Sequence, residues 1–252
     1  MREAHAAGID EILFVTGREK GGIEDLFDED PNLTAFLRAK KDERSLARIE
    51  GLARRESYFF LRQSEARGLG DAVLHGRRFV GNRPFAVFLP DDWIDSATPA
   101  IERLLEVHRK TGGAVLGLER VPKDRVSSYG VVDAEPVRGE KDVFRVRRVV
   151  EKPRVEDAPS DLTIVGRYIL LPEIFPLLAN RKAGRLGEIQ LSDALDALAR
   201  KGKVWGAILP GLRFDTGTPA GLLEATVHRG LSSPEGDRIR RLVSKRLLRP
   251  NR

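Results

Sequence analysis

Phe85-Ala86-Val87-Phe88-Leu89-Pro90-Asp91-Asp92 is a short apolar run that ends abruptly in two carboxylates. Ligands bind at the carboxyl ends of the strands in an open α/β sheet, so the position of these acids is informative. A buried strand seldom ends in unpaired acids, because an ionised carboxylate taken out of water must be paired or must coordinate a metal. A bound cation is one interpretation, and an ordinary exit from strand to loop is the other.

The composition of the chain is that of a soluble globular protein. Its 252 residues, 41% of them hydrophobic and 33% charged, can bury the core of one large domain. We find no apolar run of the length that spans a membrane and no apolar signal-peptide segment at the start, so the cytoplasm is the expected location. The lack of cysteine in the sequence excludes disulfides, thiolate metal sites and a cysteine nucleophile.

A basic tail contributes to the net charge of +6. Residues 238–252 form the densest basic run, and Ile239, Leu242, Val243 and Leu247 recur there at helical spacing. No aromatic residues alternate with these charges, as they would on a surface that stacks nucleic-acid bases. We therefore favour a solvated basic helix over a nucleic-acid-binding arm.

Apolar runs of strand length alternate with helical patterns in the first half of the chain. This alternation predicts βαβ units and a largely parallel sheet. The predicted strands are residues 12–15, 58–61, 85–89, 114–118, 129–132, 143–150 and 162–171. The predicted helices are residues 22–27, a long polar one within 32–56, 70–79 and 99–111. Because no low-complexity linker separates the halves, we predict one domain in which the second half extends the sheet.

The first residues have the pattern of a helix end. Residues 2–7 are followed by Gly8, the residue type that commonly stands just past the end of a helix. We expect a chain that begins within a helix to have lost what preceded it. In a βαβ fold the missing piece would be a strand, its turn and the start of this helix, so we expect an N-terminal truncation.

Two glycine-bearing segments could contact a ligand. Gln63 is followed by Gly68-Leu69-Gly70-Asp71-Ala72, a turn that opens a helix, where glycines admit a ligand close to the backbone and amides favour an anion. A tight connection between strand and helix is the alternative. Gly130, which follows Tyr129, either borders a ligand or simply starts a strand.

Two charged segments are further candidates. Glu151-Lys152-Pro153 ends a predicted strand with an acid and a base, which could hold a sugar hydroxyl and a phosphate; a surface ion pair is the alternative. Asp215 could cap the helix that follows it, or it could bind one metal ion together with Asp91. Mg²⁺ suits such a site because it needs only one or two protein carboxylates. The four histidines are too scattered to predict a metal site.

In chain order, these segments together resemble the bacterial UTP-glucose-1-phosphate uridylyltransferases, a nucleotidyltransferase family that makes nucleotide sugars. Each segment is weak alone, but the ordered set is highly specific and covers nearly the whole chain. The matching segments are residues 7–12, 14–18, 23–28, 62–63, 68–73, 89–92, 128–132, 149–153, 164–168, 187–194 and 214–217.

The resemblance implies an α/β fold of the nucleotide-diphospho-sugar transferase type, with a Rossmann-like, mixed and mostly parallel sheet. It divides the single domain into a nucleotide-binding half (residues 1–120), a sugar-binding half (121–230) and a basic C-terminal helix (231–252). The implied reaction joins UTP and glucose 1-phosphate into UDP-glucose and pyrophosphate, by in-line attack on the α-phosphorus with Mg²⁺ as cofactor. The family commonly self-associates, so a homo-oligomer is expected.

The resemblance also implies a role for each matching residue. Asp91 and Asp215 would hold Mg²⁺, and Lys152 would bind the phosphate of the sugar, so that Asp91 and Lys152 act in catalysis. The other implied contacts are Gln63 and Gly68 to the uracil, Glu151 and Gly130 to the glucose ring, and Val165 and Gly166 along the sugar pocket. Glu188 and Asp193 would support the site rather than bind the ligand directly.

The chain departs from the family at its start. Members begin with a strand, a glycine-rich phosphate loop and a lysine that have no counterpart in this sequence, and a mis-assigned start codon would explain the difference. We expect the strands at 12–15 and 85–89 to lack the neighbour between them, and catalysis to suffer without the loop. The alternative functions are a thymidylyl- or cytidylyltransferase of the same fold, and a non-catalytic protein that binds sugar nucleotides.

Overall fold

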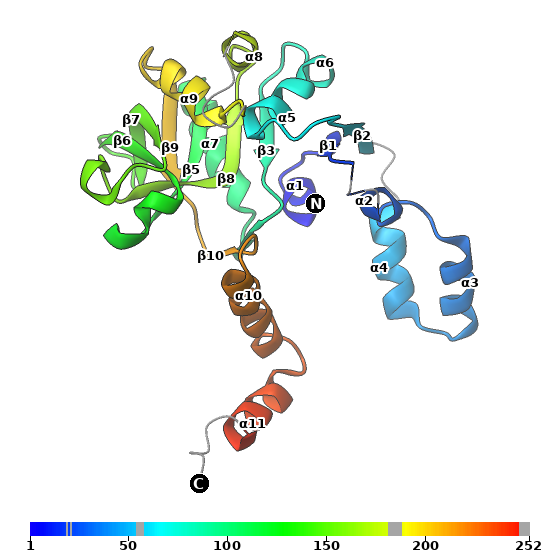
Figure 1. Cartoon of the computed structure of the whole chain (residues 1–252). Helices are drawn as coiled ribbons and strands as arrows, with labels where there is room; N and C mark the ends of the chain where they lie inside the picture. The colour runs from blue at the N-terminus through cyan, green and yellow to red at the C-terminus, as the bar shows by residue number, and fades with distance from the viewer. Residues whose placement is uncertain (19, 21, 54–57, 181–187, 247–252) are drawn as a thin grey trace.

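The structure, a computed structural model, describes residues 1–252 except 19, 21, 54–57, 181–187 and 247–252 (Figure 1). The strands are β1 Ile12–Thr16, β2 Tyr58–Arg62, β3 Phe85–Phe88, β4 Asp92–Asp95, β5 Ala114–Arg120, β6 Gly130–Pro136, β7 Val143–Glu151, β8 Leu162–Leu170, β9 Val204–Ile208 and β10 Leu212–Asp215. The central sheet has six strands in the order β3-β8-β5-β9-β7-β6. Two smaller sheets consist of β1 with β2 and of β4 with β10.

Helices cover both faces of the central sheet. The α-helices are α1 Arg2–Ala6, α2 Gly22–Asp25, α3 Pro31–Ala39, α4 Glu43–Ala53, α5 Leu69–His75, α6 Arg77–Val80, α7 Ala100–Thr111, α8 Ile174–Ala179, α9 Leu191–Ala199, α10 Pro219–Leu231 and α11 Gly236–Arg246. The 3₁₀ turns are η1 Lys123–Ser128 and η2 Val155–Asp157. Side chains of β5 alternate between the faces: Leu116 and Leu118 pack in the core with α8 and α9, whereas Val115 packs with α7.

The predicted mixed α/β fold is confirmed, but the prediction of a mostly parallel sheet is wrong for the described strands. Within the central sheet β5 and β9 run parallel, while β8 is antiparallel to both β3 and β5, and β7 is antiparallel to both β6 and β9. The reason is the length of the connections in the second half. Residues 137–142 join β6 to β7, and a parallel pair needs a crossover of roughly a dozen residues or more.

The small sheets determine where the acids lie. β4 begins at Asp92, directly after the turn that follows β3, and pairs with β10 so that Asp92 lies opposite Asp215. β1 pairs with β2, and β3 pairs with β8, so among the described residues β1 and β3 belong to different sheets.

Two predicted helices are each divided in two. The predicted helix within residues 32–56 is α3 and α4, because Lys41 takes a left-handed conformation with φ 56° and Asp42 accepts a hydrogen bond from the Ser45 N–H. The predicted helix 70–79 is α5 and α6, separated at Gly76. The helix end at residues 2–7 is confirmed, since α1 is followed by Gly8 with φ 75°.

Helices α10 and α11 extend away from the central sheet (Figure 1). Thr218 caps α10 by accepting a hydrogen bond from Gly221 N–H, and Pro219 occupies its first turn. The predicted basic helix is observed as α11, and residues 247–252 of that prediction lie outside the described residues. Within the described ranges, no helix has the length and apolar character needed to cross a membrane.

The central core gives a testable prediction of stability. Leu116→Ala should lower the free energy of unfolding by about 2–5 kcal/mol, because it removes a fully buried side chain and leaves a cavity. Urea denaturation measures this change. Leu222→Ala on α10, where the side chain is 54% exposed, is the matched control and should change stability by less than about 0.5 kcal/mol. Equal losses in the two variants would contradict the assigned core.

Candidate functional site

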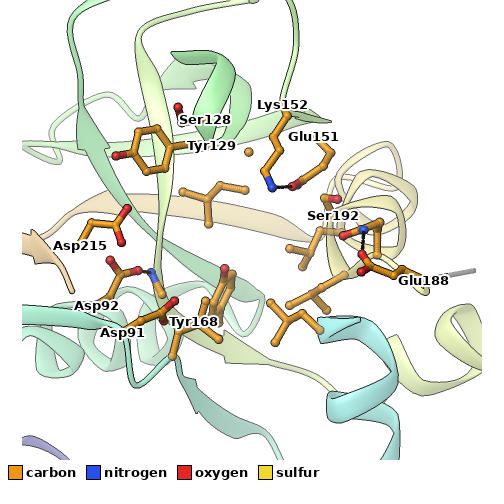
Figure 2. A pocket seen from close by; sticks show the side chains of 18 of the residues that line it. Asp91, Asp92, Ser128, Tyr129, Glu151, Lys152, Tyr168, Glu188, Ser192 and Asp215 are labelled. Carbon is orange, nitrogen blue, oxygen red and sulfur yellow. Dashed lines mark hydrogen bonds and ion pairs between the residues drawn. The ribbon is translucent and has the colours of Figure 1, made fainter. Parts of the chain in front are cut away.

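A cavity of about 380 Å³ lies among the end of β3, the strands β6, β7 and β8, and the start of α9 (Figure 2). Charged side chains gather at two places in it: three aspartates at one end, and Glu151, Lys152 and Glu188 toward the other. Its lining residues are Leu69, Leu89, Asp91, Asp92, Ser128, Tyr129, Gly130, Glu151, Lys152, Ile164, Gly166, Tyr168, Glu188, Gln190, Leu191, Ser192, Leu195, Arg213 and Asp215.

Asp91 and Asp215 lie together at one end, as the sequence predicts. The pairing of β4 with β10 brings the two segments side by side, and Thr216 donates to the Asp91 carbonyl from its N–H at 2.7 Å and its hydroxyl at 2.8 Å. A Cβ atom placed on Gly217 would lie 3.1 Å from Asp91 Oδ2 and 3.3 Å from Asp215 Oδ1. Both carboxylates therefore border one small space, which the glycine leaves open.

The chemistry of this pair fits a small hard cation. No group of three or more acidic, histidine or cysteine ligands occurs in the described part of the chain. Two carboxylates are nevertheless sufficient for Mg²⁺, which takes its remaining ligands from water and substrate phosphates. The pair therefore matches a metal bound jointly by the protein and its substrates.

Asp92 has a different role from its neighbour. It is 7% exposed, its Oδ1 accepts from Arg213 Nε at 2.5 Å, and its Oδ2 accepts from Gly166 N–H at 2.6 Å. A Cβ atom on Gly166 would lie 2.6 Å from that second oxygen, so the contact requires glycine at this position. Asp92 thus joins β4, β8 and β10 at the floor of the cavity.

Arg213 is a site residue that the sequence analysis misses. Its side chain is 12% exposed and lies within ion-pair distance of Asp215 at 3.6 Å as well as of Asp92. Its guanidinium stacks over the Tyr129 ring, 4.9 Å from the centroid. Burial lowers the pKa of Arg213, but the charge of Asp92 and the hydrogen bonds with Tyr129 and Asp92 together raise it by more, so the group stays protonated. Strand alternation is the signal that could have found it, since residues 213 and 215 share one face.

Arg167 fixes the turn that carries Asp91. The buried guanidinium donates to the Leu89 carbonyl at 3.3 Å and to the Asp92 carbonyl at 3.0 Å, on either side of Asp91. It also pairs with Glu3 of α1 at 2.9 Å, and Glu3 accepts from the Ile101 N–H at the start of α7. One arginine therefore ties this turn to two helices.

Gly130, Glu151 and Lys152 meet farther along the cavity. The β6–β7 ladder pairs Gly130 with Glu151, and Lys152 N–H donates to the Tyr129 carbonyl at 3.0 Å. Lys152 has φ 44°, a left-handed conformation that costs a lysine on the order of 1–2 kcal/mol. Its ammonium lies 4.0 Å from the Glu151 carboxylate, and the side chain is 63% exposed, so it remains accessible to an anion.

Three predicted contact residues do not line this cavity: Gln63, Gly68 and Val165. Gln63 donates to the buried Asp71 at 2.7 Å, Gly68 packs against Glu188 and Ile189, and the Val165 side chain is buried. Their contacts with a ligand stay predictions. Glu188, which the sequence assigns to support, lines the cavity, whereas Asp193 does not.

Comparisons with known proteins agree with this geometry. The model of the nucleotidyl transferase family matches residues 1–230. A UTP–glucose-1-phosphate uridylyltransferase from Staphylococcus epidermidis is 40% identical over 235 residues, which are 93% of this chain and 81% of that protein.

Solved structures agree as well. The structure of a UTP-bound UGPase from Acinetobacter baumannii has a TM-score of 0.87 at 35% identity, covering 97% of this chain and 86% of that one. A UDP-glucose pyrophosphorylase complexed with UDP-glucose has a TM-score of 0.83 at 35% identity, covering 92% of this chain and 85% of that one. The fold type and the family resemblance expected from the sequence are confirmed.

The buried pair Asp92–Arg213 provides a test of the architecture of the site. Asp92→Asn should lower the free energy of unfolding by about 3–5 kcal/mol, because it removes the buried carboxylate charge that forms the shortest ion pair of Arg213. The measurement is urea denaturation. Asp161→Asn breaks an exposed pair with Arg120 at the same 2.5 Å distance and should cost less than about 1 kcal/mol. Similar losses in the two variants would show that the buried pair contributes no more to stability than the exposed one.

Proposed function

Because the chain belongs to the nucleotidyl transferase family, among the UTP–glucose-1-phosphate uridylyltransferases, we propose that it forms UDP-glucose and pyrophosphate from UTP and glucose 1-phosphate. The observation that carries the proposal is one cavity that holds the Asp91–Asp215 pair and the accessible Lys152. A reaction between a sugar phosphate and a nucleoside triphosphate needs such groups, because both reactants carry negative charge.

The reaction is a substitution at phosphorus. A phosphate oxygen of glucose 1-phosphate forms a bond to the α-phosphorus of UTP, and the bond from that phosphorus to the bridging oxygen of the β-phosphate breaks. The electron pair leaves with pyrophosphate. Both reactants are polyanions, so the main task of the protein is to neutralise their charge and to hold them in line.

Asp91 and Asp215 would hold the Mg²⁺ ion of the reaction. When bound there, Mg²⁺ supplies positive charge to the phosphate oxygens. Arg213 and Asp92 keep these two aspartates in place, since Arg213 lies 3.6 Å from Asp215 and Asp92 follows Asp91 directly. The two carboxylates are therefore held in fixed positions where they face the substrates.

Lys152 is the cation that this cavity offers to a phosphate. The other cationic side chain in the described lining, Arg213, is already paired with Asp92 and lies near Asp215. We assign the phosphate of glucose 1-phosphate to Lys152, and the ring hydroxyls to Glu151, which can accept their hydrogen bonds, and to the space left by Gly130. The strained backbone of Lys152 supports a functional role for this position.

The remaining contacts come from the family resemblance. We propose that Gln63 and Gly68 contact the uracil, and that Val165, through its backbone, and Gly166 border the sugar. The nucleotide would then be bound by residues 1–120 and the sugar by residues 121–230. Self-association and a cytoplasmic location remain predictions from the sequence.

The proposed reaction predicts a nucleotide preference. Pyrophosphate release by the purified chain with glucose 1-phosphate and Mg²⁺ should be fastest with UTP among UTP, dTTP, CTP and ATP. Enzyme-coupled detection of pyrophosphate measures the four rates under one set of conditions. Preference for dTTP or CTP would overturn the assignment of UTP, and UDP-glucose binding without turnover would favour a non-catalytic binding protein.

The metal assignment predicts a separate effect. Asp215→Asn should weaken the apparent affinity for Mg²⁺ by more than about tenfold, because it removes one of two charged ligands. Rates measured across a Mg²⁺ titration give this value, and chelation of the metal should abolish turnover. Asp161→Asn makes the same chemical change on the surface, outside the cavity lining, and should leave the Mg²⁺ dependence unchanged. An unaltered titration in Asp215→Asn would rule out this ligand.

A further inference from the structure

The end of the cavity far from the aspartates contains polar groups to which the reaction assigns no role. Glu188 and Ser192 line this end (Figure 2), together with Gln190, which is hydrogen-bonded to Glu188; they belong to the first turn of α9 and the residues before it. Ser192 is 7% exposed, and its hydroxyl is buried without a hydrogen-bond partner in the described structure. A buried orphan hydroxyl is uncommon in a folded protein, and a missing ligand is one of its standard explanations.

The start of α9 adds backbone donors to this hydroxyl. Gln190 occupies the N-cap position, but its side chain makes no capping hydrogen bond. The first N–H groups of an α-helix have no partner within the helix, so they are available to an acceptor. The orphan Ser192 hydroxyl and the lack of a side-chain cap from Gln190 are separate observations, and both are consistent with a bound group.

The segment before α9 is held firmly by the glycine turn at the start of α5. Gly70 N–H donates to the Ile189 carbonyl at 2.8 Å, and Ile189 N–H donates to the Arg67 carbonyl at 2.7 Å. A Cβ atom on Gly70 would lie 2.6 Å from that Ile189 carbonyl, so this close contact requires glycine. The polar groups at this end are therefore preorganised.

The charges at this end indicate which chemistry it accepts. The Glu188 carboxylate accepts from Gln190 Nε2 at 2.8 Å, and the Glu151 carboxylate lines the same part of the cavity (Figure 2). Lys152 beside Glu151 is assigned to the phosphate of the sugar, and the further carboxylate of Glu188 disfavours a second phosphate, although helix N–H groups alone would favour one. A neutral group with several hydroxyls suits the set, because each hydroxyl can donate to a carboxylate and accept from an N–H or from Ser192.

We propose that Ser192 and the first turn of α9 recognise ring hydroxyls of the hexose, in addition to the contacts assigned to Glu151 and Gly130. This inference rests on the proposed function, which places a hexosyl phosphate in the cavity. Lys152 lies on the same side of the cavity as Glu151 and Glu188, away from the aspartates, so a hexose whose phosphate meets Lys152 has its ring close to the start of α9 (Figure 2). Ser192 lines the cavity, and rotation about its single side-chain torsion can turn the hydroxyl toward a ligand bound there.

Calorimetry on Ser192→Ala tests the subsite without requiring turnover. The variant should bind UDP-glucose about three- to tenfold more weakly than the wild-type chain, the effect of one neutral hydrogen bond. Its affinity for UTP, which has no hexose, should not change. Its melting temperature should be equal or higher, because the substitution removes an unsatisfied buried hydroxyl; a purely structural serine would give a lower one.

A ligand series and a second variant keep the test independent of folding. Among the 3-, 4- and 6-deoxy forms of UDP-glucose, at least one should bind the wild-type chain more weakly and yet lose no further affinity in Ser192→Ala. Ser192→Cys retains the size of the side chain with a weaker donor and should give an intermediate affinity. Ser128→Ala, which removes a hydroxyl elsewhere in the lining, should leave the order of the deoxy series unchanged.

The outcomes separate this inference from the proposed function. A wild-type chain that binds UDP-glucose, with Ser192→Ala indistinguishable from it or equally weakened for UTP, overturns the subsite alone. A wild-type chain that binds neither UTP nor UDP-glucose overturns both. Equal affinity of the wild-type chain for all three deoxy ligands and UDP-glucose also overturns the subsite.

Discussion

The buried ion pair between Asp92 and Arg213 is the interaction on which the rest of the site depends. It joins β4 to β10, and the second oxygen of Asp92 binds the Gly166 N–H of β8, so one carboxylate holds three strands. Either charge left alone in this low-dielectric setting would be costly, because burial removes its hydration. The pair therefore fixes the register in which Asp215 reaches the cavity.

Arg167 complements this pair from the other side of the turn. By binding the carbonyls of Leu89 and Asp92, it fixes the backbone on both sides of Asp91 and leaves that side chain free to face the cavity. Two adjacent aspartates consequently have different tasks: one is neutralised inside the fold, and the other meets the ligand. Placing a metal ligand on a turn held by buried arginines restricts its movement, which is the preorganisation that electrostatic catalysis uses.

Much of the site was predictable because local sequence encodes it. The adjacent Asp91 and Asp92, the Glu151-Lys152 strand end and Asp215 before a helix are visible as short patterns, and their order identified the family. Arg213, Arg167 and Ser192 were not assigned any role. Their importance comes from partners distant in the chain, such as Glu3 for Arg167. A local sequence pattern cannot predict such a partner. The strands β4, β9 and β10 were also not predicted from the sequence, because they are short and lack strong hydrophobic alternation.

The sequence by itself determined the class of fold, the family and the residue types that a metal and a sugar phosphate require, because hydrophobic periodicity and ordered motifs are local properties. Only the tertiary structure decided the strand directions of the central sheet, the division of labour between Asp91 and Asp92, and the polar end of the cavity at α9. These features depend on which segments meet in space. The partners of these hydrogen bonds and buried charges come from segments that are distant in the sequence, so the roles of the residues involved can be seen only in the folded chain.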